Sequence, residues 1–218
     1  MNLDWSWIQR NLGLIGDYLL QHSLLAVLPV LAALIVSVPL GYLVHKAGRA
    51  SNAVLALFGV IYSIPSLALF VVMPVLLGTK ILNPLNIGVA LAIYSVALLV
   101  RSVVDGLRSV PSVVKQSASA LGYGGGRRFW TVELPLAMPV IFAGLRVVTV
   151  SNIALVSVGA VIGMGALGQL FDRGLRSAFY TPIIVGLVLS LVLALIADAI
   201  ILLIQRGALP WARGRRVA

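Results

Sequence analysis

The chain has 218 residues, 61% of them hydrophobic and only 10% charged, and it contains no cysteine. Its mean hydropathy of +1.08 and its low charge exclude a soluble globular domain, in which about 25% of residues are charged. The lack of cysteine excludes disulfides and thiolate metal sites. Uncharged runs recur that are long enough to cross a bilayer, which takes about 20 apolar residues. We therefore predict an all-α polytopic membrane protein with five spans, at about 23–45, 51–78, 86–107, 137–162 and 179–205.

The sequence divides into an extracytoplasmic N-terminal segment of residues 1–22, a transmembrane domain of residues 23–205 and a basic cytoplasmic tail of residues 206–218. His22 and His45 flank the first predicted span. A histidine side chain has an apolar body and a polar tip, which suits the boundary between membrane and water. We therefore expect both imidazoles at the membrane interface.

The second predicted span, 51–78, contains Pro65 and Pro74. It is long for one crossing and too short for two. Proline is tolerated in a membrane helix where neighbouring groups satisfy the carbonyl that it frees. We predict one span that is broken at Pro65, with a partial re-entrant turn as a variant. A tight hairpin at Pro65, which would give six spans, is the alternative.

Polar side chains inside the spans are the candidates for lining a substrate pathway. Hydroxyl and amide groups of this kind also bond to the backbone of their own or a neighbouring helix, so a structural role stays open for each. The candidates are Tyr62, Ser63, Ser66, Tyr94, Ser95, Ser151 and Asn152.

Asp198 is the one carboxylate deep inside a predicted span, about 10 Å before the predicted helix end at Gln205. An acid within a membrane is a functional candidate by default. We favour a structural anchor that pairs with Arg146 over a role in proton or ion coupling.

The basic residues divide unevenly between the two sides that five spans define. Cytoplasmic loops of membrane proteins carry the excess of Lys and Arg. We therefore predict an extracytoplasmic N-terminus and a cytoplasmic C-terminus, with the 108–136 loop also in the cytoplasm. The net charge of +10 is then explained by topology, and a nucleic-acid partner is not expected. Of the 16 Lys and Arg residues, the ones assigned outside are Arg10, Lys80, Arg173 and Arg176.

The loop at 108–136 is predicted to form a first short helix and a sharp stop. Ser109 can cap this helix, and Pro111 fits its first turn. The small side chains at 117–120 allow another protein to approach the helix backbone closely. Gly122 follows as a left-handed helix stop.

A second short helix is predicted between Arg127 and Glu133, after the flexible turn at 124–126. Pro135 is expected to end this helix and to lead into the next span.

The spacing in this loop resembles the cytoplasmic signature of the membrane subunits of binding-protein-dependent ABC importers. That signature is Glu-Ala-Ala, three residues, Gly, nine residues, Ile, one residue and Leu-Pro. This chain has Gln for Glu, Ser for the first Ala and Val for Ile. The resemblance implies that the matching residues dock the loop onto an ATPase: Gln116, Ser117, Ala118, Gly122, Val132, Leu134 and Pro135. Five spans with this loop before the penultimate one also look like the methionine-importer-type permease, an ABC type I core.

A narrower resemblance to permeases for osmoprotectants is carried by VPLGYL at 38–43, YSIPSLALF at 62–70, ELPLAMPVIFAGLR at 133–146 and IGMGALG at 162–168. It implies import of glycine betaine, choline, carnitine or proline across the inner (plasma) membrane of a prokaryote. The partners that it implies are two cytoplasmic ABC ATPases that bind ATP and Mg, a second permease subunit, identical or paralogous, and an extracytoplasmic substrate-binding protein.

Two glycine-rich segments do not indicate nucleotide binding. The segment at 163–168 fits G-x-G-x-x-G but follows a membrane run and does not lie in a βαβ unit. The segment LGYGGGRR lacks the Gly-Lys-Ser/Thr ending of a phosphate loop. We expect this chain to hold no ATPase site, cofactor or metal, and not to be an enzyme. Turns and close packing are expected at Pro65, Gly163, Gly165 and Gly168.

The function predicted from these features is that of the permease subunit of an ATP-driven osmoprotectant importer. An ABC permease for another small solute, such as an amino acid, is one alternative. A stand-alone secondary carrier or channel is the other. The lack of an internal repeat and the single intramembrane acid count against that second alternative.

Overall fold

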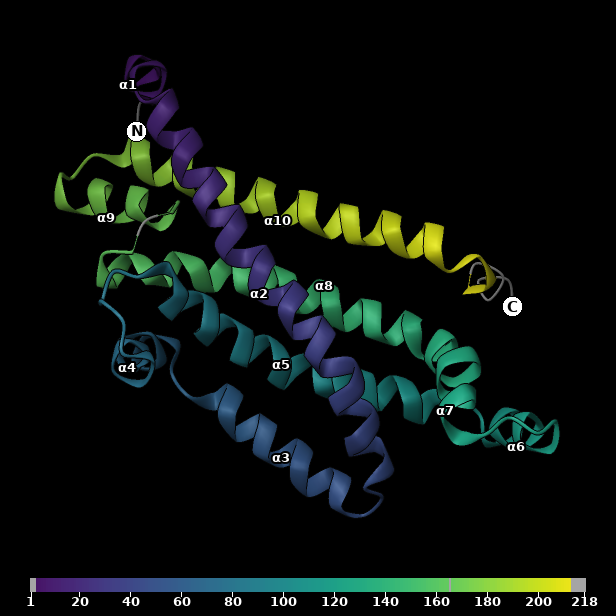
Figure 1. The fold of residues 1–218 in the computed structure, drawn as a ribbon. Helices are drawn as coiled ribbons and strands as arrows, with labels where there is room; N and C mark the ends of the chain where they lie inside the picture. Colours follow the sequence, from purple (N-terminus) through teal and green to yellow (C-terminus); the bar gives the residue numbers. More distant parts are fainter. Residues whose placement is uncertain (1–2, 165, 213–218) are drawn as a thin grey trace.

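The computed structural model describes residues 3–164 and 166–212, and every regular element in this part of the chain is a helix (Figure 1). The long helices are α2 (Leu12–Lys46), α5 (Pro84–Ser109), α8 (Leu134–Val158) and α10 (Tyr180–Ala208). The shorter elements are α1 (Trp5–Arg10), α3 (Ala50–Ser63), α4 (Ser66–Leu77), α6 (Ser112–Ala120), α7 (Gly125–Arg128), the π-helical turn η1 (Phe129–Glu133), the 3₁₀ turn η2 (Gly159–Ile162) and α9 (Gly168–Arg176).

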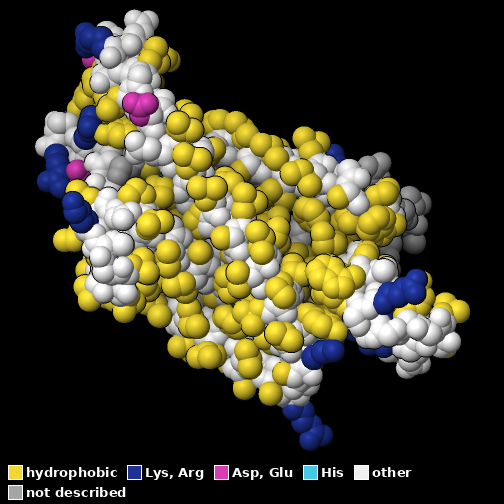
Figure 2. All heavy atoms as spheres, viewed as in Figure 1, with side chains coloured by type: hydrophobic (Ala, Val, Ile, Leu, Met, Phe, Trp, Pro, Cys, Tyr) yellow, Lys and Arg dark blue, Asp and Glu magenta, His cyan; other side chains and the backbone are white. Residues whose placement is uncertain are grey.

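By length and composition, four helices could cross a membrane, and one of them is the continuous helix from Gly125 to Ile162 that α7, η1, α8 and η2 form together. A fifth crossing results if the bent pair α3 and α4 is one span. Hydrophobic side chains cover the middle of the molecule, and charged side chains gather toward its ends (Figure 2). The predicted all-α membrane architecture is confirmed: the long helices correspond to the first, third, fourth and fifth predicted spans, and the bent pair corresponds to the second.

Helix α5 lies at the centre of the bundle and packs against α2, α3, α4 and α8. Helix α2 crosses over α5 and α8, and glycines permit the close contacts (Figure 1). A Cβ on Gly41 would lie 2.6 Å from Cγ1 of Val103, and a Cβ on Gly106 would lie 2.9 Å from the carbonyl oxygen of Ala137. Helix α10 lies at the edge of the bundle, where it packs against α8 and α9.

The chain bends by 93° between α3 and α4, at Ile64 and Pro65. Ile64 has an extended backbone with ψ 131°, and Pro65 precedes the first residue of α4. The hydroxyl of Tyr94 on α5 donates a 2.6 Å hydrogen bond to the carbonyl of Ile64. The chain therefore bends sharply at Pro65, and the carbonyl of Ile64 at this bend is hydrogen-bonded. The hairpin that would give six spans does not form. Pro74 lies inside α4 and does not interrupt it.

The two ends of the bundle carry different segments (Figure 1). One end, called the α6 end here, carries α6, α7, the turn between α2 and α3, and the end of α10. The other, called the α1 end, carries α1, α9 and the turn between α4 and α5. The segments that the sequence assigned to each side of the membrane thus lie together.

The first long helix begins at Leu12, well before the apolar run that starts at Ser23. His22 therefore lies inside the bundle, where it is fully buried and its Nε2 lies 2.9 Å from the carbonyl oxygen of Ile153 on α8. The prediction of an interfacial His22 is wrong, because α2 begins eleven residues before the predicted span and His22 packs against α8. His45 is half-buried in the last turn of α2.

Two predicted helix boundaries in the 108–136 loop are also wrong. Ser109 is the last residue of α5 and does not cap α6, because its hydroxyl bonds back to the carbonyl of Gly106. The N-cap position of α6 is Pro111. Pro135 does not end a helix. It falls in the first turn of α8, directly after the wider π-helical turn η1, and the helix continues through it.

Candidate functional site

Helix α6 projects from the bundle (Figure 1), and most of its residues are exposed. Residues at i, i+3, i+4 and i+7 of a helix share a face, and in α6 these are Val113, Gln116, Ser117 and Ala120, all exposed. Val113 is 69% exposed, and Leu121, just past the helix, is 78% exposed. The apolar members of this exposed surface are Val113, Ala120 and Leu121. We call these five residues the α6 face.

Ala118 lies on the opposite side of α6 and is only 6% exposed. Of the signature residues, Gln116 and Ser117 are therefore on the α6 face, and Ala118 packs α6 onto the rest of the chain. Val132, Leu134 and Pro135 are half-buried, in η1 and the first turn of α8.

Gly122 ends α6 in the left-handed conformation that the sequence predicts, with φ +82°. The amide of Tyr123 donates to the carbonyl of Ala118 at 3.1 Å, and the amide of Gly122 donates to that of Ser119 at 3.0 Å. These two bonds define a Schellman motif. A Cβ on Gly122 would meet no atom within 4 Å, so backbone conformation, and not space, is what selects glycine.

Polar contacts tie α6 to the membrane helices. The ammonium of Lys115 donates to the carbonyl of Leu107 in α5 at 2.9 Å. Arg128 donates from Nη1 to the hydroxyl of Ser119 at 2.7 Å and from Nε to Oε1 of Glu133 at 2.6 Å. Glu133 is 3% exposed, so this ion pair is largely shielded from solvent. The sequence interpretation missed this link, although Glu133 is the one acid of the loop and its spacing of five residues from Arg128 suits a π-helical turn.

Aromatic rings fix η1 against α2. The ring of Phe129 is buried and lies 4.1 Å from that of Tyr42, centroid to centroid. Trp130 follows and is 62% exposed. The α6 face is thus mounted on a segment that contacts three membrane helices, α2, α5 and α8.

The candidate pathway residues fall into two groups. Tyr62, Ser63, Ser66 and Tyr94 gather at the bend between α3 and α4, where the rings of Tyr62 and Tyr94 meet edge to face at 5.7 Å. Non-helical backbone at membrane depth occurs only where protein covers it or where it lines a water-filled cavity. Residues 62–65 at this bend are exposed in the single chain.

The second group is buried and joins helices. The amide of Asn152 donates to the hydroxyl of Ser95 at 2.9 Å and to the carbonyl of Ala26 at 3.4 Å. Asn152 is 1% exposed and Ser95 is fully buried. These contacts hold α8, α5 and α2 together. Ser151 is half-buried beside them.

Arg146 and Asp198 form the ion pair that the sequence suggested, and it is bidentate. The Nε–Oδ1 distance is 2.6 Å and the Nη2–Oδ2 distance is 2.7 Å. The pair links α8 to α10, and each side chain is about one third exposed. Because α10 continues to Ala208, Asp198 lies about 15 Å from the helix end and not 10 Å, deeper than the sequence indicated.

The glycines after α8 shape a compact turn. Gly163 has φ +77°, and a Cβ on Gly168 would lie 2.4 Å from the carbonyl oxygen of Ser157. Gly165 lies outside the described residues. The described residues also contain no group of three or more His, Asp or Glu side chains that could hold a metal.

Residues 17–209 match the protein family described as binding-protein-dependent transport system inner membrane component. The chain is 34% identical over 200 residues to the glycine betaine/carnitine/choline transport system permease protein OpuCD of Bacillus subtilis, covering 89% of this chain and 86% of that one. It is also 34% identical to the osmoprotectant import permease protein OsmW of Salmonella typhimurium, covering 86% and 88%.

Two further similarities concern a fused relative and the fold. The ergothioneine transport permease/ergothioneine binding protein EgtU of Helicobacter pylori is 31% identical over 172 residues, which is 79% of this chain and 31% of that one. A chain of the MetNI methionine ABC transporter superposes with a TM-score of 0.75 at 18% identity, over 90% of this chain and 97% of that one.

Proposed function

Because this chain belongs to the family of binding-protein-dependent transport system inner membrane components, we propose that it is the permease of an ATP-driven importer for a small osmoprotectant such as glycine betaine, carnitine, choline or proline. The observation that carries the proposal is the 34% identity to two osmoprotectant permeases over most of the chain. The fold of the MetNI chain supports the same permease architecture.

A permease for another small solute is the second candidate. The observation that favours it is the 31% identity to EgtU, whose name specifies ergothioneine. The family match removes the support for a stand-alone carrier or channel, since members of this family are components of multi-subunit systems.

The α6 face would dock onto a cytoplasmic ATPase. It is exposed, apolar at Val113 and Leu121, and held in a fixed orientation by the Schellman motif and by Arg128. Two ATPases, which would bind ATP and Mg, two permease subunits and an extracytoplasmic binding protein would complete the importer. This chain would contribute no ATPase site of its own.

Reconstitution tests this function directly. The chain is co-expressed with a candidate ATPase and binding protein, purified and placed in liposomes that contain ATP. We expect uptake of radiolabelled glycine betaine, carnitine or choline that depends on ATP. Uptake of ergothioneine alone would select the second candidate, and failure of any ATPase to co-purify would contradict the permease proposal.

The α6 end would face the cytoplasm. The chain has no native cysteine, so Leu3→Cys and Ala212→Cys provide single labelling sites at the two ends. We expect a membrane-impermeant maleimide to label position 3 from outside intact cells and position 212 only after the cells are opened. Labelling of both positions from the same side would contradict an odd number of spans.

Gly122→Val is expected to uncouple ATP hydrolysis from transport. A residue with a Cβ costs about 1–2 kcal/mol in the left-handed conformation, which is too little to unfold the bundle but enough to let α6 continue and shift the α6 face. Gly122→Asn is expected to be milder, because Asn tolerates this conformation. The measurement is solute taken up per ATP hydrolysed in liposomes.

Gly124→Val is the matched control, since Gly124 has φ −64° and equally open space around a Cβ. Gly124→Val should take up as much solute per ATP hydrolysed as the unchanged chain. An equal loss of coupling at positions 122 and 124 would show that the added side chain, and not the backbone conformation, matters.

A further inference from the structure

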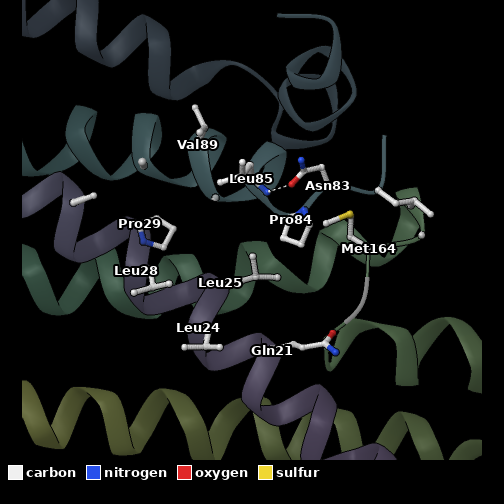
Figure 3. Close-up of a pocket in the computed structure, with 15 residues that line it drawn as sticks. Gln21, Leu24, Leu25, Leu28, Pro29, Asn83, Pro84, Leu85, Val89 and Met164 are labelled. Carbon is white, nitrogen blue, oxygen red and sulfur yellow. Dashed lines mark hydrogen bonds between the residues drawn. The ribbon is translucent and has the colours of Figure 1, made fainter. Parts of the chain in front are cut away.

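A large groove opens between α2 and α5 toward the α1 end (Figure 3). Helix α2 crosses over α5, and the two helices approach closely at Gly41 and Val103. The space between them measures about 910 Å³ and is open at the side of the bundle. Met164, from the turn that follows η2, closes one part of the groove.

The lining of this groove is almost entirely apolar. Of the 15 residues that line it, only Gln21 and Asn83 have polar side chains, and both lie toward the same end in Figure 3. The wall on α2 includes Leu24, Leu25 and Leu28, and the wall on α5 includes Leu85, Gly88 and Val89. Away from these two residues, the side chains of the groove offer no partners for ordered water.

The length of the groove matches one leaflet of a bilayer. From Gln21 to Ala32 the α2 wall rises about 16 Å, at 1.5 Å per residue. Half of the hydrocarbon core is about 15 Å. The polar residues stand at the α1 end, where the headgroups of that leaflet would lie, and the deeper part of the groove is purely apolar.

The polar end is held in place by a buried asparagine. Asn86 is fully buried, donates to the carbonyls of Lys80 at 2.8 Å and Ile81 at 3.1 Å, and accepts a hydrogen bond from the hydroxyl of Thr79. This network fixes the non-helical turn that carries Lys80, in which the amide of Asn83 donates to the carbonyl of Lys80 at 3.0 Å. The ammonium of Lys80 is exposed and has no ion pair or hydrogen bond within residues 3–164 and 166–212.

We propose that this groove is a phospholipid site, in which one acyl chain lies between α2 and α5 and the phosphate pairs with the ammonium of Lys80. An empty groove would forfeit the dispersion contacts of its walls, and the surrounding bilayer supplies apolar chains at this depth. Lys80 does not line the groove but precedes the lining residues Leu82 and Asn83 by two and three positions, so its cation would complement the phosphate. The site requires only that the chain is inserted in a membrane, so its test is independent of which solute is transported.

Photo-cross-linking in liposomes tests the site. The probe is phosphatidylglycerol with a diazirine in one acyl chain, and mass spectrometry maps the labelled residues. We expect label concentrated on the facing sides of α2 and α5, within 21–32 and 82–92. Label spread evenly over all the membrane-facing helices would overturn the proposal.

Gly88→Leu fills the groove, because a Cβ at this position meets no atom within 4 Å. We expect label in the groove to fall about tenfold, equivalent to ~1.4 kcal/mol. Gly59→Leu, on α3 with equally open space, is the matched control and should leave the label unchanged. An equal loss in both variants, or no loss in either, would contradict a specific site.

Two more arms address the headgroup and a competing occupant. Lys80→Gln should weaken labelling, whereas Lys80→Arg, which keeps the positive charge, should label as strongly as the unchanged chain. Equal labelling of the two variants would show that Lys80 does not bind the phosphate.

The variant Gly88→Cys tests for a second copy of the chain. Its thiol should stay accessible to a lipid-soluble maleimide and should not form a disulfide between two chains. Formation of that disulfide would show that a second copy of the chain, and not a lipid, occupies the groove.

Discussion

Ala120→Arg is expected to abolish binding of the ATPase while the permease still inserts and folds. Ala120 lies on the α6 face, so an arginine there makes no clash within the chain but places an unpaired charge in the proposed interface. An uncompensated charge in an interface costs about 3 kcal/mol or more, which lowers affinity by at least about 100-fold. The measurement is the amount of ATPase that co-purifies with the permease from detergent-solubilised membranes.

Ala47→Arg is the control, because Ala47 is also exposed at the α6 end and receives the same charge. It should retain the ATPase. Ala118 would be a poor test position, because it packs against the chain and an arginine there would disturb folding. Full co-purification with Ala120→Arg would show that the partner does not contact the α6 face.

Separating Arg146 from Asp198 is expected to have the largest effect on folding. Asp198→Leu or Arg146→Leu leaves a single charge at membrane depth, where its partner has supplied both of its hydrogen bonds. We expect each single variant to lose most of its monodisperse protein on size-exclusion chromatography after mild heating. The double variant should recover most of it, because an apolar pair often replaces an ion pair at little cost.

Uptake by the double variant separates the two interpretations of Asp198. A structural anchor predicts that recovery of folding brings recovery of ATP-driven uptake. A role in ion or proton coupling predicts a folded double variant that no longer transports. Single variants as stable as the unchanged chain would contradict the anchor.

Composition and spacing were sufficient for the helical class, the spans and the main turns. The left-handed conformation of Gly122 could be predicted because it depends on a local pattern, a glycine directly after a short helix of small residues. The pair of Arg146 with Asp198 could be predicted because Asp198 is the one acid deep in a predicted span. The bend at Pro65 follows equally from the lack of an amide hydrogen on proline.

The remaining features depend on contacts between distant segments. The burial of His22 requires the carbonyl of Ile153, which no local pattern places beside it. The helix continues through Pro135 because the π-helical turn before it alters the hydrogen-bond register, and a single sequence carries no clear signal for such a turn. The sequence could not predict that Ala118 is the buried residue of α6, because residues 117–120 are all small and show no apolar-polar pattern.

The unbroken helix from Gly125 to Ile162 joins the α6 face to the opposite end of the bundle in one piece. Its 38 residues rise about 57 Å at 1.5 Å per residue. It is attached at several levels along this length, by Phe129 to Tyr42, by Ala137 to Gly106 and by Asn152 to Ser95. A pull on α6 would therefore not turn this helix about one residue but would shift it together with α2 and α5, so that the core of the subunit moves as one rigid body.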